Sequence, residues 1–455
     1  MNIPLNGRIA IIDDKIEQAI PLMRVLSKNQ IPYVYYKGND LKFLPEEDSR
    51  YNDIRILFLD INLLNDLAKQ DDKVLKSVLY SVLKRVISPN NFPYTLIYWS
   101  RHQDEYSSIV EELFNNELKD RKPINLKEFI KSDFFPNFSA DEVENEIDLL
   151  MEINKIIDSQ LAYSYLLNWE NQVHLAADLT LQEIFSSYHM FKDWTNNANF
   201  ILEKLGKAYL GNHYITNTLE DKIRASFIAF NSVFKDSLES QIYNSKIPNS
   251  LPLTYNKSEI EFNINLINEK LNLSKEIKDI CESGNVIVFE NRNDLFATLL
   301  HRLISLFKLK NKFKVTNKDI EEIELTKIAA AEHKRIKTEI KASWKKIAIV
   351  VTPVCDFVQK DNKIYDRIVK GVMIPLKYKD YIDDKSEAVY ILPISITHNG
   401  SVFIIVLDFR YFVTLDFKVE RISGLFRVRQ ELLSEIQSKL ARHINRQGVL
   451  FIDER

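Results

Sequence analysis

Residues 54–62 read Ile-Arg-Ile-Leu-Phe-Leu-Asp-Ile-Asn, a short apolar run that ends in a carboxylate at Asp60. A run of this length, rich in Ile, Leu and Phe, predicts a strand that is buried on both faces of a parallel sheet. Ligands of open α/β sheets bind where the parallel strands end, so we expect Asp60 at such an edge. Acidic residues at this position also commonly cap the next helix or turn, so Asp60 alone does not define a site.

The first third of the chain repeats this pattern. Three other apolar runs end at the pair Asp13-Asp14, at Ser100 and at Lys131. Strands that alternate with helices predict an α/β fold with a doubly wound parallel sheet over residues 1–138. A further strand is predicted at 33–36, and helices are predicted at 15–28, 72–86 and 106–115.

The polar residues at these strand ends resemble those of the receiver domain of bacterial response regulators. That family has an acidic pair after its first strand and a phosphate-accepting Asp after its third. It has Ser or Thr after the fourth strand and Lys after the fifth. The resemblance covers the first third of the chain and is closest to the divergent receivers of bacterial conflict and defence systems. The matching residues are Asp13, Asp14, Asp60, Ser100 and Lys131.

The resemblance implies phosphorylation of Asp60 by a histidine kinase or another phosphodonor protein. Asp60 would attack phosphorus as a nucleophile, with Mg²⁺ neutralising the phosphoryl group. Lys131 would place a positive charge on the phosphoryl oxygens, and Ser100 would donate a hydrogen bond to them. Mg²⁺ prefers oxygen ligands. The ligands expected for it are Asp13, Asp14, Asp60 and the main-chain carbonyl of Asn62.

Two features depart from the receiver pattern. Ser132 follows Lys131 where receivers usually have Pro, and the spacing from Asp60 to Ser100 and on to Lys131 is stretched. A Lys-Pro pair occurs at 122–123, but it follows a polar, helix-like segment instead of an apolar strand. A degenerate receiver that serves only as a docking module therefore stays open as an alternative.

Composition limits the class of protein. At roughly 150 residues per domain, 455 residues predict about three domains. The 61 basic and 64 acidic residues nearly cancel, so neither nucleic acid nor a membrane is indicated as a partner. Two cysteines exclude a disulfide framework and indicate a cytoplasmic protein, and no apolar stretch approaches the length of a spanning helix. The 9 glycines include no phosphate loop or dinucleotide fingerprint.

The remaining two thirds of the chain predict two further regions. Residues 139–345 read as a helical middle region with a linker near 244–258, where Pro, Asn and Ser gather. Within it, the alternating lysines of 308–314 predict a solvated edge strand, with contact to nucleic acid as the less common alternative. Residues 346–455 predict a small α+β domain, β-rich and closed by a terminal helix whose inward residues run from Leu425 to Ile444.

The C-terminal region contains a Thr-Pro-Val-Cys-Asp stretch at 352–356, which looks similar to an uncharacterised bacterial domain with no known activity. Cys355 beside Asp356 could be a nucleophile or a metal ligand, with His398 or His443 as the local base. No spacing supports either pairing. A buried thiol and a turn-forming Asp is the commoner arrangement.

Three functions follow from these features. The first is a response-regulator-like signalling protein that is phosphorylated on Asp60 and takes part in anti-phage defence. We expect it to act through contacts with other protein subunits and not through DNA, because no helix-turn-helix pattern is convincing. The second is a receiver-gated effector enzyme, a nuclease or hydrolase, with its site near Cys355, Asp356 and Lys360. The third is a non-catalytic subunit of a defence complex with a degenerate receiver.

Overall fold

The computed structural model divides into two compact units, each described by itself. The first comprises residues 1–199 and 228–255, and the second comprises 200–227 and 256–455. The structure describes residues 3–4, 8–47, 53–63, 72–89, 91–100, 106–136, 146–185, 193–246, 253–261, 263–277, 282–289, 299, 303–316, 321–353, 365–383, 385–415 and 422–445.

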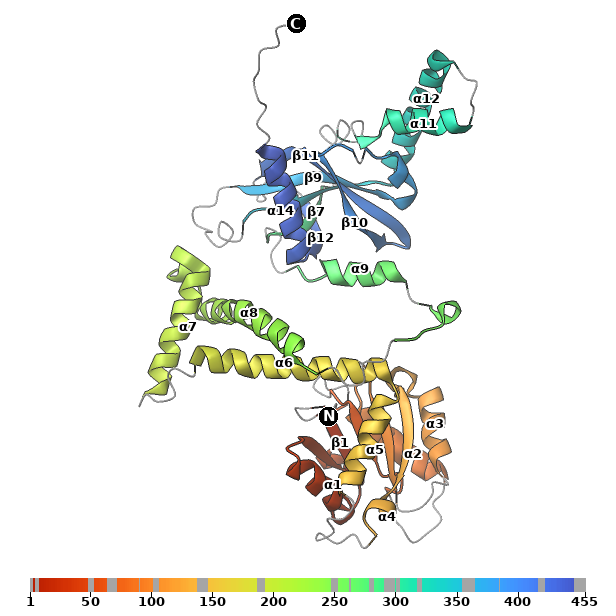
Figure 1. The fold of residues 1–455 in the computed structure, drawn as a ribbon, viewed down its shortest axis with the longest axis vertical. Coiled ribbons are helices and arrows are strands. Elements are labelled where there is room, and N and C mark those ends of the chain that lie inside the picture. Colours follow the sequence, from red (N-terminus) through yellow and green to blue (C-terminus); the bar gives the residue numbers. More distant parts are fainter. Residues whose placement is uncertain are drawn as a thin grey trace. The chain divides into compact units, whose positions relative to one another are not determined.

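The first unit contains a five-stranded sheet in which every paired strand is parallel (Figure 1). The spatial order is β2-β1-β3-β4-β5, one of the two common orders of doubly wound α/β sheets. The α/β fold and the parallel sheet predicted from the sequence are therefore confirmed. The strands are β1 (Ile9–Asp13), β2 (Tyr33–Lys37), β3 (Ile56–Leu59), β4 (Thr95–Ser100) and β5 (Asn125–Ile130).

Helices cover both faces of this sheet, which explains why its central strands are apolar throughout. Ile11 and Phe58 pack on one face with α1 (Ile16–Lys28) and α5 (Glu146–Asp158). Residues of opposite parity in the same strands, such as Ile12 and Leu59, pack on the other face. That second face is covered by α2 (Asp72–Val86) and α3 (Ser107–Asn116).

The long helix α6 (Leu161–Phe185) begins against this sheet. Glu170 accepts two hydrogen bonds from Arg55 Nε, at 3.0 and 3.2 Å, and one from its Nη2 at 2.9 Å. The Tyr163 hydroxyl donates to the main-chain oxygen of Arg55. The helical middle region continues with α7 (Trp194–Leu210) and α8 (Leu219–Asn244), and the division between the units at 255 and 256 falls within the segment predicted as a linker.

The second unit contains a seven-stranded antiparallel sheet with the order β10-β11-β9-β8-β7-β12-β6 (Figure 1). Its first two strands come from before residue 346, so the sheet extends into the region predicted as the helical middle. The strands are β6 (Leu273–Ser274), β7 (Asn285–Phe289), β8 (Lys345–Val350), β9 (Asp366–Pro375), β10 (Val389–His398), β11 (Ser401–Leu415) and β12 (Ile422–Val428).

Helices also cover both faces of the antiparallel sheet. The terminal helix α14 (Gln430–Ile444) buries its apolar side in one core, and α12 (Glu322–Ser343) with α11 (Leu306–Thr316) packs in the core of the other face. Helix α9 (Ile264–Asn272) precedes β6 directly. In the part of the chain that the structure describes, no helix is both long and apolar enough to cross a membrane.

Local predictions for two segments were wrong. The lysine-rich segment 308–314 lies in helix α11, because Leu309 and Phe313 are four residues apart and share one helix face, with Leu309 fully buried. The terminal helix begins at Gln430, because the residues before it form strand β12. Ile444, predicted to point inward, is 53% exposed.

Candidate functional site

Three carboxylates gather at the carboxyl edge of the parallel sheet. Asp13 is the last residue of β1, Asp14 follows it, and Asp60 follows β3. One ligand oxygen from each lies within 4.8 Å of the others, and the three residues are only 0%, 7% and 4% exposed. Parallel pairing of β1 with β3 produces this arrangement, because it aligns Ile12 with Leu59 and so brings the residues after them together.

The main chain fixes two of these carboxylates through one oxygen each. Asp13 Oδ1 accepts a hydrogen bond from the Lys15 amide at 2.9 Å, and Asp60 Oδ1 accepts one from the Asn62 amide at 3.0 Å. The Asp60 amide in turn donates to the Ile12 carbonyl at 2.8 Å. Each side chain therefore keeps its second oxygen, Oδ2, for other partners.

Lys131 supplies the positive charge at this cluster. It follows β5 directly, begins the short helix α4 (Lys131–Phe134) and is fully buried. Its ammonium donates to Asp60 Oδ2 at 2.5 Å, to Asp13 Oδ2 at 2.7 Å and to Gln18 Oε1 at 3.2 Å. These three bonds use all the donors of the ammonium group. The rival Lys122 is exposed and bonds to Asn115 instead.

Burial makes the ionised form of Asp13 costly. Loss of solvent around the carboxylate raises the pKa of Asp13 from 3.8 to about 6, the attraction of Lys131 opposes this, and the charge of Asp60 adds to it. The three carboxylates carry three negative charges when ionised, and the ammonium of Lys131 contacts two of them, Asp13 and Asp60. Among the described residues this cluster offers buried carboxylate oxygens as ligands, and such oxygens suit a hard divalent cation such as Mg²⁺.

Ser100 lies at the same edge of the sheet. It is the last residue of β4 and pairs with Ile130, the residue before Lys131. Ser100 is 2% exposed, and its hydroxyl oxygen is buried without a hydrogen-bond partner in the described part of the chain. A buried hydroxyl without a partner costs roughly 1–3 kcal/mol, so a bound group that accepts its hydrogen bond would offset that cost.

The structure thus brings Asp13, Asp14, Asp60 and Lys131 together and places Ser100 at the same edge. Two neighbours were missed by sequence reasoning. Gln18 reaches Lys131 from α1, and the Tyr35 hydroxyl donates to the Asp13 carbonyl at 3.0 Å. No local motif marks either residue. The Asn62 amide binds Asp60, and its carbonyl stays a predicted metal ligand.

The candidate catalytic residues of the C-terminal region are described only in part. Cys355, Asp356 and Lys360 lie outside the described residues. His398 ends β10, where its ring meets that of Phe403, and burial together with the charge of Lys345 lowers the pKa of His398. The structure therefore gives no geometry for a thiol–histidine pair.

Comparisons of this chain with protein-family models, with curated protein sequences and with solved structures find no match. A functional inference therefore rests on the side chains themselves. The cluster that combines buried carboxylates, a buried lysine and an unpartnered hydroxyl is the strongest basis for one.

Proposed function

We propose that this chain is a response-regulator-like signalling protein that accepts a phosphoryl group on Asp60. One observation carries the proposal: the fully buried ammonium of Lys131 bonds to both Asp13 and Asp60 at the carboxyl edge of a parallel sheet. A structural salt bridge needs only one carboxylate for each lysine. A surplus of buried carboxylates is costly in the resting protein and becomes useful when a cation and a phosphoryl group enter.

In the proposed reaction Asp60 is the nucleophile. An oxygen of Asp60 forms a bond to phosphorus while the bond between phosphorus and the donor's leaving atom breaks, and the leaving group takes up a proton. The hydrogen bond from the Asn62 amide holds Oδ1, so Oδ2 is the oxygen positioned to attack. Bound Mg²⁺ would neutralise charge on the phosphoryl group, with Asp13 and Asp14 among its ligands.

Lys131 and Ser100 would bind the oxygens of the phosphoryl group once it is on Asp60. Once Oδ2 is bonded to phosphorus it no longer carries a full charge, and the ammonium that contacts it at 2.5 Å can interact with the phosphoryl oxygens. The unpartnered Ser100 hydroxyl can donate to the same oxygens. A change at Ser100 would then report the phosphorylated state.

Output through protein contacts is supported by the link between this sheet and α6. Arg55 directly precedes β3, Asp60 directly follows it, and the Arg55 guanidinium bonds to Glu170 of α6. We propose that a partner kinase supplies the phosphoryl group and that the helical region transmits the state to other subunits, in a bacterial defence system. The pairing of Arg55 with Glu170 gives that helix a direct connection to the phosphoacceptor strand.

A second candidate function is that of a degenerate receiver in a non-catalytic subunit, and the salt bridges of Lys131 favour it. The ammonium already occupies Oδ2 of both Asp13 and Asp60, the oxygens that a metal ion and a phosphoryl group would use. If this salt bridge is permanent, the parallel-sheet region offers only a surface. The effector-enzyme alternative rests on Cys355 and its neighbours, which lie outside the described residues.

Calorimetry with beryllofluoride and Mg²⁺ separates the first two functions, since beryllofluoride on an aspartate stands in for the acyl phosphate. We expect wild type to bind it only when Mg²⁺ is present, Asp60→Asn not to bind it, and Asp120→Asn, which changes an exposed carboxylate of the same sheet region, to bind it normally. Absence of binding in folded wild type would overturn phosphorylation and leave the degenerate receiver.

A further inference from the structure

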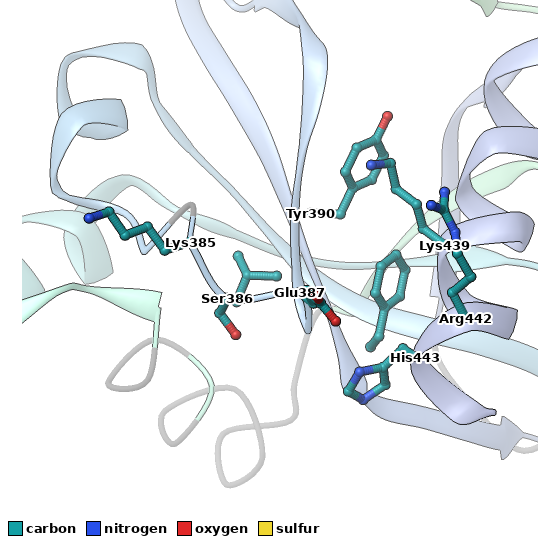
Figure 2. Close-up of a pocket in the computed structure, with 9 residues that line it drawn as sticks. Lys385, Ser386, Glu387, Tyr390, Lys439, Arg442 and His443 are labelled. Atoms are coloured by element: carbon teal, nitrogen blue, oxygen red, sulfur yellow. The ribbon is translucent and has the colours of Figure 1, made fainter. Parts of the chain in front are cut away.

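A second site lies in the other unit, where α14 packs beside the antiparallel sheet. A cavity of about 340 Å³ opens there between β10, β11 and the last two turns of α14. This volume is at the lower end of small-molecule sites, so it suits one compact ligand. Figure 2 shows Lys439, Arg442 and His443 of α14 close to Tyr390 and Glu387 at this cavity.

Two cationic side chains border the cavity on the helix side. Lys439 lies with its ammonium 4.8 Å from the centre of the Tyr390 ring and 3.8 Å from Glu435, a long ion pair that leaves it available to a stronger anion. Arg442 is one helical turn further on and exposed. Basic residues also suit the negative end of a helix, but that role does not require a cavity. A phosphate can accept hydrogen bonds from both side chains.

Aromatic rings form the floor of the cavity. Tyr390 and Phe409 are stacked at 15°, with centroids 6.3 Å apart, and the His443 ring lies 6.2 Å from Phe409 at 36°. The aromatic carbon atoms of these residues give this part of the lining an apolar surface that can pack against a planar ring or a sugar. A ligand that matches both the floor and the cations is therefore an organic anion.

Two polar groups add specificity. The Nδ1 atom of His443 is buried and has no hydrogen-bond partner within the described ranges, and a buried unpaired polar atom is costly unless a ligand satisfies it. Glu387 contributes a carboxylate to the lining. A carboxylate accepts hydrogen bonds and repels anions, so it would face the hydroxyl-bearing part of a ligand instead of its phosphate.

We propose that this cavity binds a nucleoside monophosphate, with its phosphate at Lys439 and Arg442 and its ribose hydroxyls at Glu387. The base or sugar packs on the floor made by Tyr390, Phe409 and His443. This site is in the second unit and does not depend on phosphorylation of Asp60. It gives the C-terminal region a small-molecule input that the sequence did not indicate.

The test is calorimetric titration of the full chain with AMP, GMP, CMP and UMP, each beside its nucleoside and beside inorganic phosphate. We expect at least one nucleotide to bind, and to bind at least about tenfold more tightly than either of its parts. Loss of one charge-assisted hydrogen bond should weaken binding by about tenfold or more in Arg442→Gln and in Lys439→Gln. The control Lys341→Gln removes an exposed lysine in the last turn of α12 and should bind as wild type does.

Glu387→Gln tests the orientation of the ligand. Wild type should prefer the ribonucleotide to its 2′,3′-dideoxy analogue, and the variant should lose that preference while still binding the phosphate. Failure of all four nucleotides to bind folded wild type would overturn the proposal. So would inorganic phosphate binding as tightly as the nucleotides, or equal affinity in wild type, Arg442→Gln and Lys439→Gln.

Discussion

Replacement of Asp13 by Asn should stabilise the parallel sheet at neutral pH, because it removes a buried charge that the fold tolerates at a cost. Burial raises the pKa of Asp13 from 3.8 to about 6, and the attraction of Lys131 only partly opposes this. At about 1.4 kcal/mol for each tenfold change in proton affinity, the ionised form costs about 3 kcal/mol at pH 7. Asn has nearly the same shape, but its single amide oxygen can accept from only one of the two donors that Asp13 serves, the Lys15 amide and the Lys131 ammonium, so the loss of one hydrogen bond offsets part of this gain.

The sign of the pH dependence follows from the raised pKa. Below pH 3.8 Asp13 is protonated in both the folded and the unfolded chain, and its burial has no ionisation cost. As the pH rises from about 4 to about 6, the unfolded chain ionises first, so the free energy of unfolding falls. The stability difference between Asp13→Asn and wild type should therefore grow across this interval and stay constant above it.

Hydrogen exchange of the full chain measures this stability difference. Exchange is carried out at increasing urea concentrations, at pH 4 and at pH 7, and mass spectrometry follows the peptides that contain β1, β3 and β4. Asp120→Asn is the matched control, because it removes an exposed carboxylate from the same region. A variant Asp13→Asn that is less stable than wild type at pH 7, or whose advantage is equal at pH 4 and pH 7, would refute burial as the dominant cause.

Three other changes test the packing around both sheets. Lys131→Met should destabilise the parallel sheet by about 3–5 kcal/mol at pH 7 and by less at pH 4, because it leaves two buried carboxylates without their counter-charge. The same hydrogen-exchange experiment measures this effect. Glu170→Gln should weaken the bidentate pair with Arg55 and lower protection of α6 by roughly 1–3 kcal/mol, and unchanged α6 exchange would show the pair to be dispensable. Gly371→Ala should destabilise the antiparallel sheet by roughly 1–3 kcal/mol in urea unfolding, since a Cβ atom there would lie 2.5 Å from the Val406 carbonyl oxygen; a wild-type midpoint would show that the strands can separate.

The alternation of apolar runs with helix-like segments was enough to predict the parallel sheet of the first unit. Each central strand is buried on both faces, and such strands are uninterrupted apolar segments that stand out in a sequence. The segment 308–314 shows where this reasoning fails. Its lysines alternate as in an edge strand, but the burial of Leu309 against α12 selects a helix, and that contact is not encoded within the segment itself.

Some residues of the candidate site could be predicted from local sequence, and others depend on contacts between remote segments. Asp13, Asp60 and Ser100 could be selected from the sequence because each stands where an apolar strand stops, and parallel strands end at a common edge. Gln18 could not be selected in this way. It lies on α1, and its contact with Lys131 joins residues 113 positions apart.

The sequence by itself determined which polar residues reach the edge of the parallel sheet, since strand length and apolar periodicity are local properties. Only the tertiary structure decided that one ammonium bonds to two carboxylates 71 and 118 positions away, and that burial raises the pKa of Asp13. The cavity beside α14 likewise exists only because β10, β11 and that helix pack together. Hydrogen bonds and desolvation depend on distances between remote segments, and those distances are set by packing of the cores.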